Sequence, residues 1–434
     1  MREMKDSGVE WIGEIPICWK LDKIKHHFYI SAGTTPKSDE PEMWDGEVIW
    51  ITPADFKTDD VYVEQGHRNI SEYGFKSSSL TIIPTGSIIF SKRAPIGQVV
   101  INSADLCTNQ GCLSALPFDE SEVRYYRYLM IVANEEFELS GSGTTFKEIS
   151  AKSFGNTILP HPDIADQIRI ADYLDRKCSK IDEIIAKQEQ IIEKLKEYKL
   201  SVITEAVTKG LNPSTDMKYS GIEWIGDIPA EWQIGKTLYA LAMPITDGPH
   251  ETPDLYDEGI PFVSAEAVSS GNGSIDFSHI RGFISREYYE ECCKKYVPRI
   301  NDIYMIKSGA TTGKVALVDT EDRFTIWSPL GVFRCDEEKM DYLYFFYFLQ
   351  SDAYQKQVQD KWSYGTQQNI GMRTLEKLFV CFPDLAEQKE IAMFLDNKVS
   401  QINNLIEKKQ TESEKLKEYK KSLIYEIVTG KKEV

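Results

Sequence analysis

The chain contains one long helical segment twice, and this internal repeat constrains its fold more than any other feature. The first copy begins at Pro162 and the second at Pro383, 221 residues later, and both contain the string KLKEYK. Apolar residues recur in each copy at alternating steps of three and four, which predicts a coiled-coil seam. We expect that seam to contain Leu174, Ile181, Ile185, Leu195, Tyr198 and Val202 of the first copy, and Leu395, Ile402, Ile406, Leu416, Tyr419 and Leu423 of the second.

The ends of the repeated helix are also visible. Asp384 with Glu387 three residues later fits a capping box, and Gly210 and Gly430 stand where a helix should stop. From Ile164 to Thr208 a helix of 45 residues would be roughly 65 Å long. Either copy alone would suit a dimerisation rod equally well. Two copies, each preceded by other sequence, favour an internal spacer in which the copies pair antiparallel.

A second repeat precedes each helix. Residues 7–19 read SGVEWIGEIPICW and residues 220–232 read SGIEWIGDIPAEW, 213 residues apart. The order of the two repeats predicts a chain of domain, helix, domain and helix. We place these segments at residues 1–159, 160–210, 211–381 and 382–434. We expect the tryptophans of the second repeat to be packing anchors: Trp11, Trp19, Trp224 and Trp232.

The two domains are predicted to be α+β, each with a mixed or antiparallel sheet. Short β-rich runs lie between Gly, Pro, Asn and Ser residues in both domains. We expect strands at residues 48–51, 87–90, 99–101, 261–263, 303–306 and 315–317. An aromatic, helix-like stretch follows in each domain, at residues 125–137 and 342–354. A polar glycine loop comes next, at residues 140–145 in the first domain and 362–369 in the second.

Composition limits the functional classes. The formal net charge is −18, which by itself counts against nucleic-acid binding, although a local basic groove or a partner could supply the phosphate contacts. No apolar run reaches the roughly 18 residues of a membrane helix, and the N-terminus lacks the apolar region of a signal peptide. Eight cysteines without a CxxC pair favour a reduced cytoplasmic protein.

The sequence contains no recognised catalytic motif, and we therefore expect no catalytic centre. The segment Ser308–Val315 resembles a phosphate-binding loop, but it has three residues between its glycines and a valine after Lys314. The six histidines never take HExxH spacing, so we expect no metal site. Neither a GxSxG elbow nor a GxGxxG loop after a strand is present. An enzyme with an unrecognised site stays an alternative that turnover by the purified chain would support.

These features together resemble one family. The doubled SGxEWIGxIPxxW motif, the doubled helix with KLKEYK, the turns at Gly97 and Gly313, and the loops at Gly143 and Gly365 make the chain similar to the specificity subunit (S subunit, HsdS) of prokaryotic type I restriction–modification systems. The resemblance implies a non-catalytic subunit. Each of its two domains would read one half of a bipartite, asymmetric site on double-stranded DNA, and the coiled coil would set the spacer.

The resemblance also implies partners. Two methyltransferase subunits would dock on the coiled coil, and motor-nuclease subunits would complete the restriction complex. S-adenosylmethionine, ATP and magnesium would bind those partners, and this chain would need no cofactor or membrane. The alternative function is a coiled-coil scaffold that binds proteins and does not read DNA.

We expect the DNA contacts to come from polar loop residues, because Asn and Gln can pair with adenine and Arg and Lys with guanine. In the first domain the candidates are Thr34, Thr35, Lys37, Lys92, Arg93, Gln98, Ser142, Thr144, Thr145 and Lys147. In the second domain they are His250, Lys307, Thr311, Thr312, Lys314, Tyr364, Thr366, Gln367, Gln368, Asn369 and Arg373.

Overall fold

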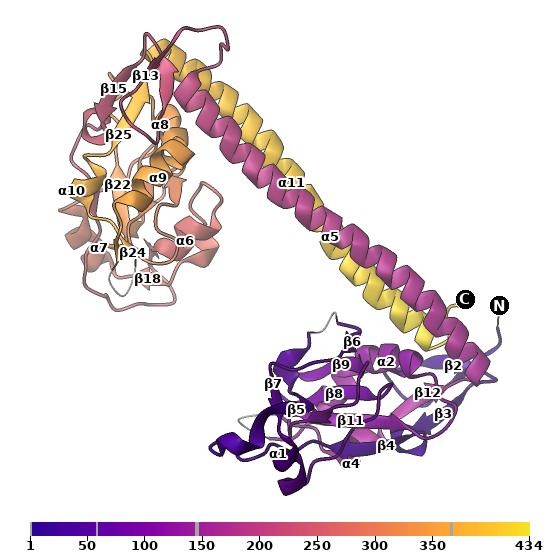
Figure 1. Cartoon of the computed structure of the whole chain (residues 1–434). Helices are drawn as coiled ribbons and strands as arrows, with labels where there is room; N and C mark the ends of the chain where they lie inside the picture. The colour runs from indigo at the N-terminus through magenta and orange to yellow at the C-terminus, as the bar shows by residue number, and fades with distance from the viewer. Residues whose placement is uncertain (1, 58–59, 144–146, 365–367) are drawn as a thin grey trace. The chain divides into compact units, whose positions relative to one another are not determined.

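The computed structural model describes residues 2–57, 60–143, 147–364 and 368–434, without the side chains of residues 363–364. The chain forms two compact units, residues 1–188 with 411–434 and residues 189–410 (Figure 1). Each unit contains one mixed α/β domain and part of both long helices. This division does not test the predicted segment limits, which stay predictions. Among the described residues, no helix is long and apolar enough to span a membrane.

The first domain is built on a five-stranded sheet with the order β4-β11-β8-β9-β6, in which only β6 and β9 pair in parallel. A three-stranded sheet, β10-β5-β7, lies beside it, and β1-β2 and β3-β12 form two short ladders. The elements are β1 (Met4–Asp6), β2 (Glu14–Pro16), β3 (Lys20–Lys23), β4 (Phe28–Ala32), β5 (Trp44–Ile51), β6 (Tyr62–Val63), β7 (Arg68–Ile70), α1 (Glu72–Ser77), β8 (Ile88–Lys92), β9 (Ile96–Asn102), β10 (Cys107–Thr108), β11 (Cys112–Pro117), α2 (Val123–Val132), α3 (Asn134–Leu139), α4 (Ala151–Asn156), β12 (Ile158–His161) and α5 (Ile164–Lys209).

The second domain repeats this plan with a four-stranded antiparallel sheet, β16-β22-β19-β20. The smaller sheet β18-β17-β21 and the ladders β13-β14, β15-β25 and β23-β24 complete it. The elements are β13 (Met217–Tyr219), β14 (Asp227–Pro229), β15 (Gln233–Lys236), β16 (Thr246–Asp247), β17 (Ile260–Val263), α6 (Ala265–Ser270), β18 (Phe283–Ile284), α7 (Arg286–Cys293), β19 (Ile303–Ile306), β20 (Val315–Leu317), β21 (Thr325–Ile326), β22 (Leu330–Phe333), α8 (Tyr342–Gln350), α9 (Asp352–Asp360), β23 (Ser363–Tyr364), β24 (Gln368–Asn369), α10 (Met372–Leu375), β25 (Phe379–Phe382) and α11 (Leu385–Val428).

The two long helices are confirmed, with 46 residues in α5 and 44 in α11. Asp384 caps α11 by accepting the backbone N–H groups of Ala386 and Glu387, at 3.0 Å each. The capping box is one-sided, however, because the Glu387 carboxylate instead accepts the indole N–H of Trp232, at 3.3 Å. A side chain that a tertiary contact occupies cannot bond back to its own helix end.

The helices pack antiparallel inside each unit. In the first unit, Leu174 and Ile181 of α5 share a core with Leu423 of α11, and in the second unit Ile192 packs with Ile402. Each of these residues is at least nine-tenths buried.

The seam differs from the prediction at Tyr198 and Tyr419, whose side chains are 48% and 52% exposed. The heptad that runs through Ile185 and Ile192 places Lys199 in the seam, where its Nζ donates to Asn403 at 3.0 Å. Lys420, at the equivalent position, donates to Asp182 at 2.6 Å. The prediction gave most weight to apolar character and therefore chose the tyrosine in each helix. The heptad instead places the lysine that follows each tyrosine in the seam.

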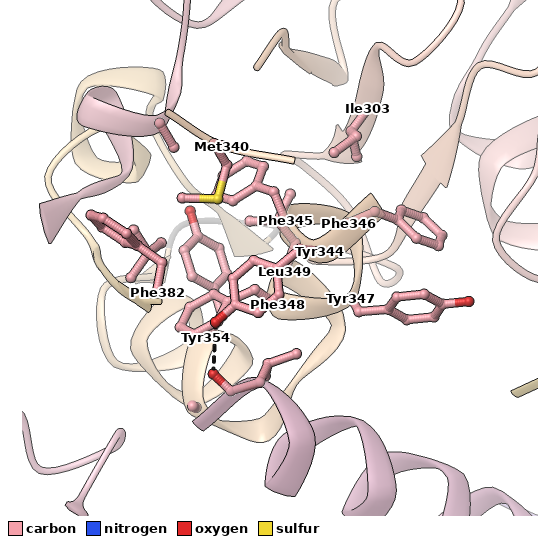
Figure 2. Close-up of a cluster of buried hydrophobic side chains, with 14 of the residues drawn as sticks. Ile303, Met340, Tyr344, Phe345, Phe346, Tyr347, Phe348, Leu349, Tyr354 and Phe382 are labelled. Carbon is pink, nitrogen blue, oxygen red and sulfur yellow. Dashed lines mark hydrogen bonds between the residues drawn. The ribbon is translucent and has the colours of Figure 1, made fainter. Parts of the chain in front are cut away.

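Each aromatic stretch is two helices rather than one. In the second domain, α8 ends where the side chain of Ser351 caps α9, and in the first domain α2 gives way to α3 at Ala133. The α8 side chains Tyr344, Phe345 and Phe348 fill the second domain's core, which Figure 2 shows together with residues such as Phe382 of β25. In the second domain Ser351 followed by Asp352 is an N-cap signal that marks the break, and the prediction overlooked it because aromatic residues continue to Tyr354.

One tyrosine in each domain joins that domain to the end of a long helix. The Tyr125 hydroxyl lies 3.1 Å from the carbonyl of Val428, the last residue of α11. The Tyr344 hydroxyl lies 3.0 Å from the carbonyl of Val207, near the end of α5. Both tyrosines are at least 99% buried. Each of these carbonyls has no partner inside its own helix. Each hydroxyl also lies near a second carbonyl, Pro160 at 3.2 Å for Tyr125 and Cys381 at 2.8 Å for Tyr344, so its single proton is shared between two acceptors.

A glutamine near the start of each long helix makes the complementary link. The Gln167 side chain accepts the backbone N–H of Glu122, the N-cap of α2, at 3.0 Å. The Gln388 side chain accepts the backbone N–H of Asp341, the N-cap of α8, at 2.8 Å. Each domain is therefore fixed to the start of one long helix and to the end of the other. We name this set of contacts the joint.

The tryptophans divide into two groups. Trp19 and Trp232 are 2% exposed and anchor the joint as expected, and the Trp19 indole donates to Asp166 at 3.3 Å. Trp11 is partly buried against the first domain's core. Trp224 is 40% exposed and is not an anchor in this structure.

We predict that Tyr125→Phe and Tyr344→Phe each lower the free energy of unfolding of their own unit by about 1–3 kcal/mol, because buried carbonyls lose their donor. Hydrogen exchange of the two units, read by mass spectrometry, measures each loss separately. Tyr29→Phe, at a side chain that is 64% exposed, is the matched control and should change neither unit. Equal protection in all three variants would contradict the assigned role of the joint.

A histidine pair lies next to the first joint. The rings of His27 and His161 stack with their centroids 3.9 Å apart. His27 Nδ1 contacts Asp119 at 2.6 Å and its Nε2 contacts Asp22 at 3.3 Å, while His26 contacts the other oxygen of Asp22 at 2.5 Å.

The neighbours of His161 keep it neutral. The Tyr126 hydroxyl lies 2.5 Å from His161 Nδ1, where a neutral ring can accept its proton. Burial, and then the adjacent His27, lower the pKa of His161 below its ordinary value of 6.5. The second domain has Phe382, stacked on Tyr239 at 5.4 Å, where the first has His161.

Stability of the first unit should therefore depend on pH. The unfolded chain takes up a proton at His161 near pH 6.5, whereas the folded chain resists it, so the contribution is complete above that pH and declines below it. We expect exchange protection of β3 and β12 to fall as the pH drops below about 6.5. His161→Phe, which installs the second domain's residue, should flatten this decline. A decline of the same size in the variant would rule out His161 as its source.

Candidate nucleic-acid interface

The first domain gathers several predicted residues at one end of its five-stranded sheet. At this end β4 and β8 stop and β9 and β11 begin. The joint lies at the opposite end of the sheet, where β11 ends and the backbone N–H of Phe118 donates to the carbonyl of His27. The backbone N–H of Lys92 donates to Gly111 at 2.9 Å, and that of Ile149 donates to Lys92 at 3.1 Å. We name this end the recognition edge of the first domain.

Loops from three parts of the sequence meet there. The backbone N–H of Thr34 donates to Thr108 at 2.9 Å, and the Thr35 hydroxyl bonds the side chain of Gln110. Ser142 exchanges both backbone hydrogen bonds with Glu148, at 3.1 and 3.0 Å. Residues more than 100 positions apart along the chain thus form one surface.

The cations of this edge share one carboxylate. Lys92 Nζ lies 2.7 Å from one oxygen of Glu148, and Arg93 Nη1 lies 3.4 Å from the other. The hydrogen bond from Lys92 holds the pKa of Glu148 below its usual range, against the opposing effect of partial burial. The carboxylate is therefore ionised and neutralises part of the edge's positive charge.

The other candidates of the first domain are more scattered. Lys37 is exposed and forms an ion pair with Glu40 at 2.7 Å. The backbone N–H of Gln98 donates to Ser91 Oγ at 2.8 Å, and the side-chain oxygen of Gln98 has no hydrogen-bond partner among the described residues. Lys147 is exposed. Thr144 and Thr145 lie outside the residues that the structure describes.

The second domain builds its edge on the same backbone frame. The N–H of Lys307 donates to Pro329 at 2.6 Å, and that of Ile370 donates to Lys307 at 2.9 Å. These bonds match those of Lys92 with Gly111 and Ile149. The Gly309 N–H also donates to Gln368 at 3.0 Å, which brings the second polar loop to the end of β19. We name this end the recognition edge of the second domain.

The turns next to both edges require glycine. Gly97 and Gly313 have φ angles of +98° and +93°. A Cβ at Gly97 would lie 1.4 Å from the side-chain oxygen of Asn134, and one at Gly313 would lie 2.4 Å from that of Gln355. Both backbone conformation and space therefore exclude other residues.

The charges of the second edge differ from those of the first. Asp247, 1% exposed, lies 2.5 Å from Lys295 Nζ, 2.7 Å from Lys307 Nζ and 3.3 Å from His250 Nε2. Burial alone would raise the pKa of Asp247, but the two lysines hold it below its usual range. A cavity of about 430 Å³ opens beside this group, between Asp247, His250 and Tyr288.

The remaining candidates of the second domain occupy varied positions. Thr312 is buried and donates to the Gly309 carbonyl at 2.7 Å, and Thr311 beside it is half-buried. The Lys314 ammonium donates to the Ser269 carbonyl at 3.3 Å. Gln368 is half-buried, whereas Asn369 and Arg373 are exposed. The side chain of Tyr364 and the residues Thr366 and Gln367 lie outside the described part of the chain.

Sequence reasoning missed Glu148 and Asp247, the two acids that organise these edges. Basic, amide and hydroxyl side chains are the types predicted to contact DNA, and a carboxylate is not among them. Glu148 follows the candidate Lys147 directly, but nothing in the local pattern connects it with Lys92. The contact roles of the predicted residues stay predictions.

The described residues hold no cluster of three or more His, Cys, Asp or Glu side chains arranged to bind a metal ion. Both edges consist of loops at the end of a sheet, and these loops carry cations, amides and hydroxyls. Such an arrangement suits recognition of a polar, anionic polymer.

Comparisons with known proteins identify the family. The model of the type I restriction modification DNA specificity domain matches residues 16–197 and 249–415. The MjaIX specificity subunit of a type I restriction enzyme from Methanocaldococcus jannaschii is 36% identical over 190 residues, which span 42% of this chain and only 43% of that subunit. The putative MjaX specificity subunit from the same organism is 25% identical over 438 residues, 97% of this chain and 95% of that protein.

A solved structure shows the same fold. The matching chain comes from work on the complex assembly and conformational transition of the type I R-M system, with a TM-score of 0.71 and 16% identity over 95% of this chain and 98% of that one. The family model covers well over half of the present sequence, including parts of both domains and both helices. This chain therefore belongs to the family of specificity subunits of type I restriction–modification systems.

Proposed function

We propose that this chain is the DNA sequence-specificity subunit of a type I restriction–modification complex and that each domain reads one half of a bipartite, asymmetric target. The observation that carries the proposal is the repetition of one backbone frame with different side chains at its edge. Lys92 and Lys307 occupy the same place in this frame, yet the first pairs with Glu148 and the second with Asp247. Different groups on matched scaffolds are what two different half-sites require.

The recognition edges have the chemistry for base reading. Amide, hydroxyl and basic side chains on loops can pair with the distinct donor and acceptor patterns of the major groove. The strands behind these loops hold them in place, as the bonds at Lys92 and Lys307 illustrate. The chain itself performs no catalysis in this proposal.

The long helices would set the spacer between the two half-sites. Each is continuous, and 46 residues of α-helix rise about 69 Å. Because every domain bonds to the start of one helix and the end of the other, a change in helix length should act on both domains together.

The same helices would dock two methyltransferase subunits. Apolar side chains outside the seam are 41–52% exposed on both helices. They follow a seven-residue spacing on α5, at Ile184, Ile191 and Tyr198, and lie 14 residues apart on α11, at Leu405 and Tyr419. Such a stripe suits a helical partner. S-adenosylmethionine, ATP and magnesium would then bind the methyltransferase and motor-nuclease subunits. With a net charge of −18, this chain would also rely on those partners for most phosphate contacts.

We predict that one bipartite N6-methyladenine motif disappears from the genome when the gene for this chain is deleted. The partner methyltransferase would then lack the subunit that directs it to the target sequence. Genome-wide methylation mapping with and without the gene measures this directly. Expression of the gene from a plasmid should restore the motif.

Exchange of domains separates this proposal from the scaffold alternative. Replacing only the second domain by that of a relative should change one half of the motif and preserve the other. An unchanged motif after the exchange would favour a scaffold that does not read DNA.

Helix length gives a further prediction. One heptad inserted in each long helix, after Glu189 and after Gln410, keeps the seam in register and adds about 10 Å. We expect both half-sites to persist while the spacer grows by about three base pairs, at roughly 3.4 Å each. A two-residue insertion at the same places, which turns the apolar positions on either side of it to opposite faces of the helix, should abolish methylation. Altered half-site bases in the heptad variant would contradict the proposal that the helices set the spacer length.

A further inference from the structure

A carboxylate neutralises the lysine that ends the central strand of each domain. Glu148 contacts Lys92 and Arg93 in the first domain, and Asp247 contacts Lys307 in the second. The lysines hold equivalent places, but the acids come from different parts of the two domains. Glu148 follows the glycine loop, whereas Asp247 ends the strand β16.

Burial distinguishes the two acids. The side chains of Asp247 and Lys307 are 1% and 10% exposed, so their ion pair belongs to the interior of the second domain. The side chains of Glu148 and Arg93 are 37% and 36% exposed, so their pair lies at the surface where a ligand can reach it. The other cation on Glu148, Lys92, has a side chain that is 14% exposed, so removal of Glu148 leaves this largely buried ammonium without its carboxylate.

A paired cation interacts with DNA differently from a free one. A free lysine or arginine gains affinity from any phosphate, because binding releases condensed counterions whatever the base sequence. A cation held by a carboxylate must give up that partner to bind a phosphate, so it gains less. A cation held in this way keeps its other N–H donors in a fixed direction. Arg93 is an example, because it bonds Glu148 through only one of its nitrogens.

We propose that Glu148 is a specificity-determining residue of the first domain, which restrains Lys92 and Arg93 so that they read bases rather than bind phosphates without selection. This inference rests on the proposed function and adds a residue to it. Glu148 acts through the two cations and is a positioning residue. Its carboxylate also repels a phosphate that approaches the edge in a wrong register.

The test is the salt dependence of DNA binding by the complex of this chain with its methyltransferase subunits. Two duplexes serve as probes, one with the motif found by methylation mapping and one with the same bases scrambled. For Glu148→Gln we expect tighter binding to the scrambled duplex, with the slope of log K against log salt steeper by roughly 0.9 for each cation released. The preference for the motif should fall by about tenfold or more.

Asp336→Asn is the matched control. It removes one negative charge from an ion pair with Lys339, beyond the end of β22 that lies opposite the recognition edge. The proposal expects this variant to keep the wild-type slope and preference. If both variants change alike, net charge explains the effect and the inference is wrong.

Arg93→Gln provides a second measurement, which also decides the matter if Glu148→Gln does not fold. Because Glu148 already holds Arg93, binding to the scrambled duplex should change by less than about twofold, while binding to the motif weakens by about tenfold. Equal weakening on both duplexes would show that Arg93 is an ordinary phosphate contact and would overturn the inference. A wild-type complex without any motif preference would instead refute the proposed function itself.

Discussion

The structure depends on hydrogen bonds that tie each domain to both long helices. Tyr125 reaches the last carbonyl of α11 across 303 residues of sequence, and Tyr344 reaches Val207 of α5 across 137. Neither domain can complete its core without the end of a helix that starts in the other half of the chain. The two halves of the chain are therefore coupled in folding.

Duplication with divergence explains the rest of the architecture. The backbone bonds at Lys92 and Lys307 are the same, and glycine is required at both Gly97 and Gly313. Because these bonds involve only main-chain atoms, the frame survives changes of the side chains that it carries. The joint and the seam must fit a partner inside the protein, whereas the side chains at the recognition edges differ between the two domains.

The acidic composition of the chain agrees with the ion pairs at the candidate interface. A net charge of −18 leaves little general attraction for DNA, and cations at the two edges are paired with Glu148 and Asp247. In the proposed function such an edge would contribute direction more than affinity, because Lys92, Arg93 and Lys307 already have a counter-charge. The affinity would then come from partner subunits, and the selection from this chain.

The sequence by itself determined the order of the segments, the two long helices, most of the strands and the family. These features follow from local periodicity and from repeats, which a single chain displays directly. It misplaced the seam at Tyr198, because apolar character was weighed above the heptad that Lys199 continues. Only the tertiary structure decided which charges meet. Glu148 finds Lys92 through a sheet edge where four strands begin or end, and no spacing along the chain encodes that meeting. Ion pairs between distant loops depend on the tertiary fold of the whole domain, so they can be identified only from the folded structure.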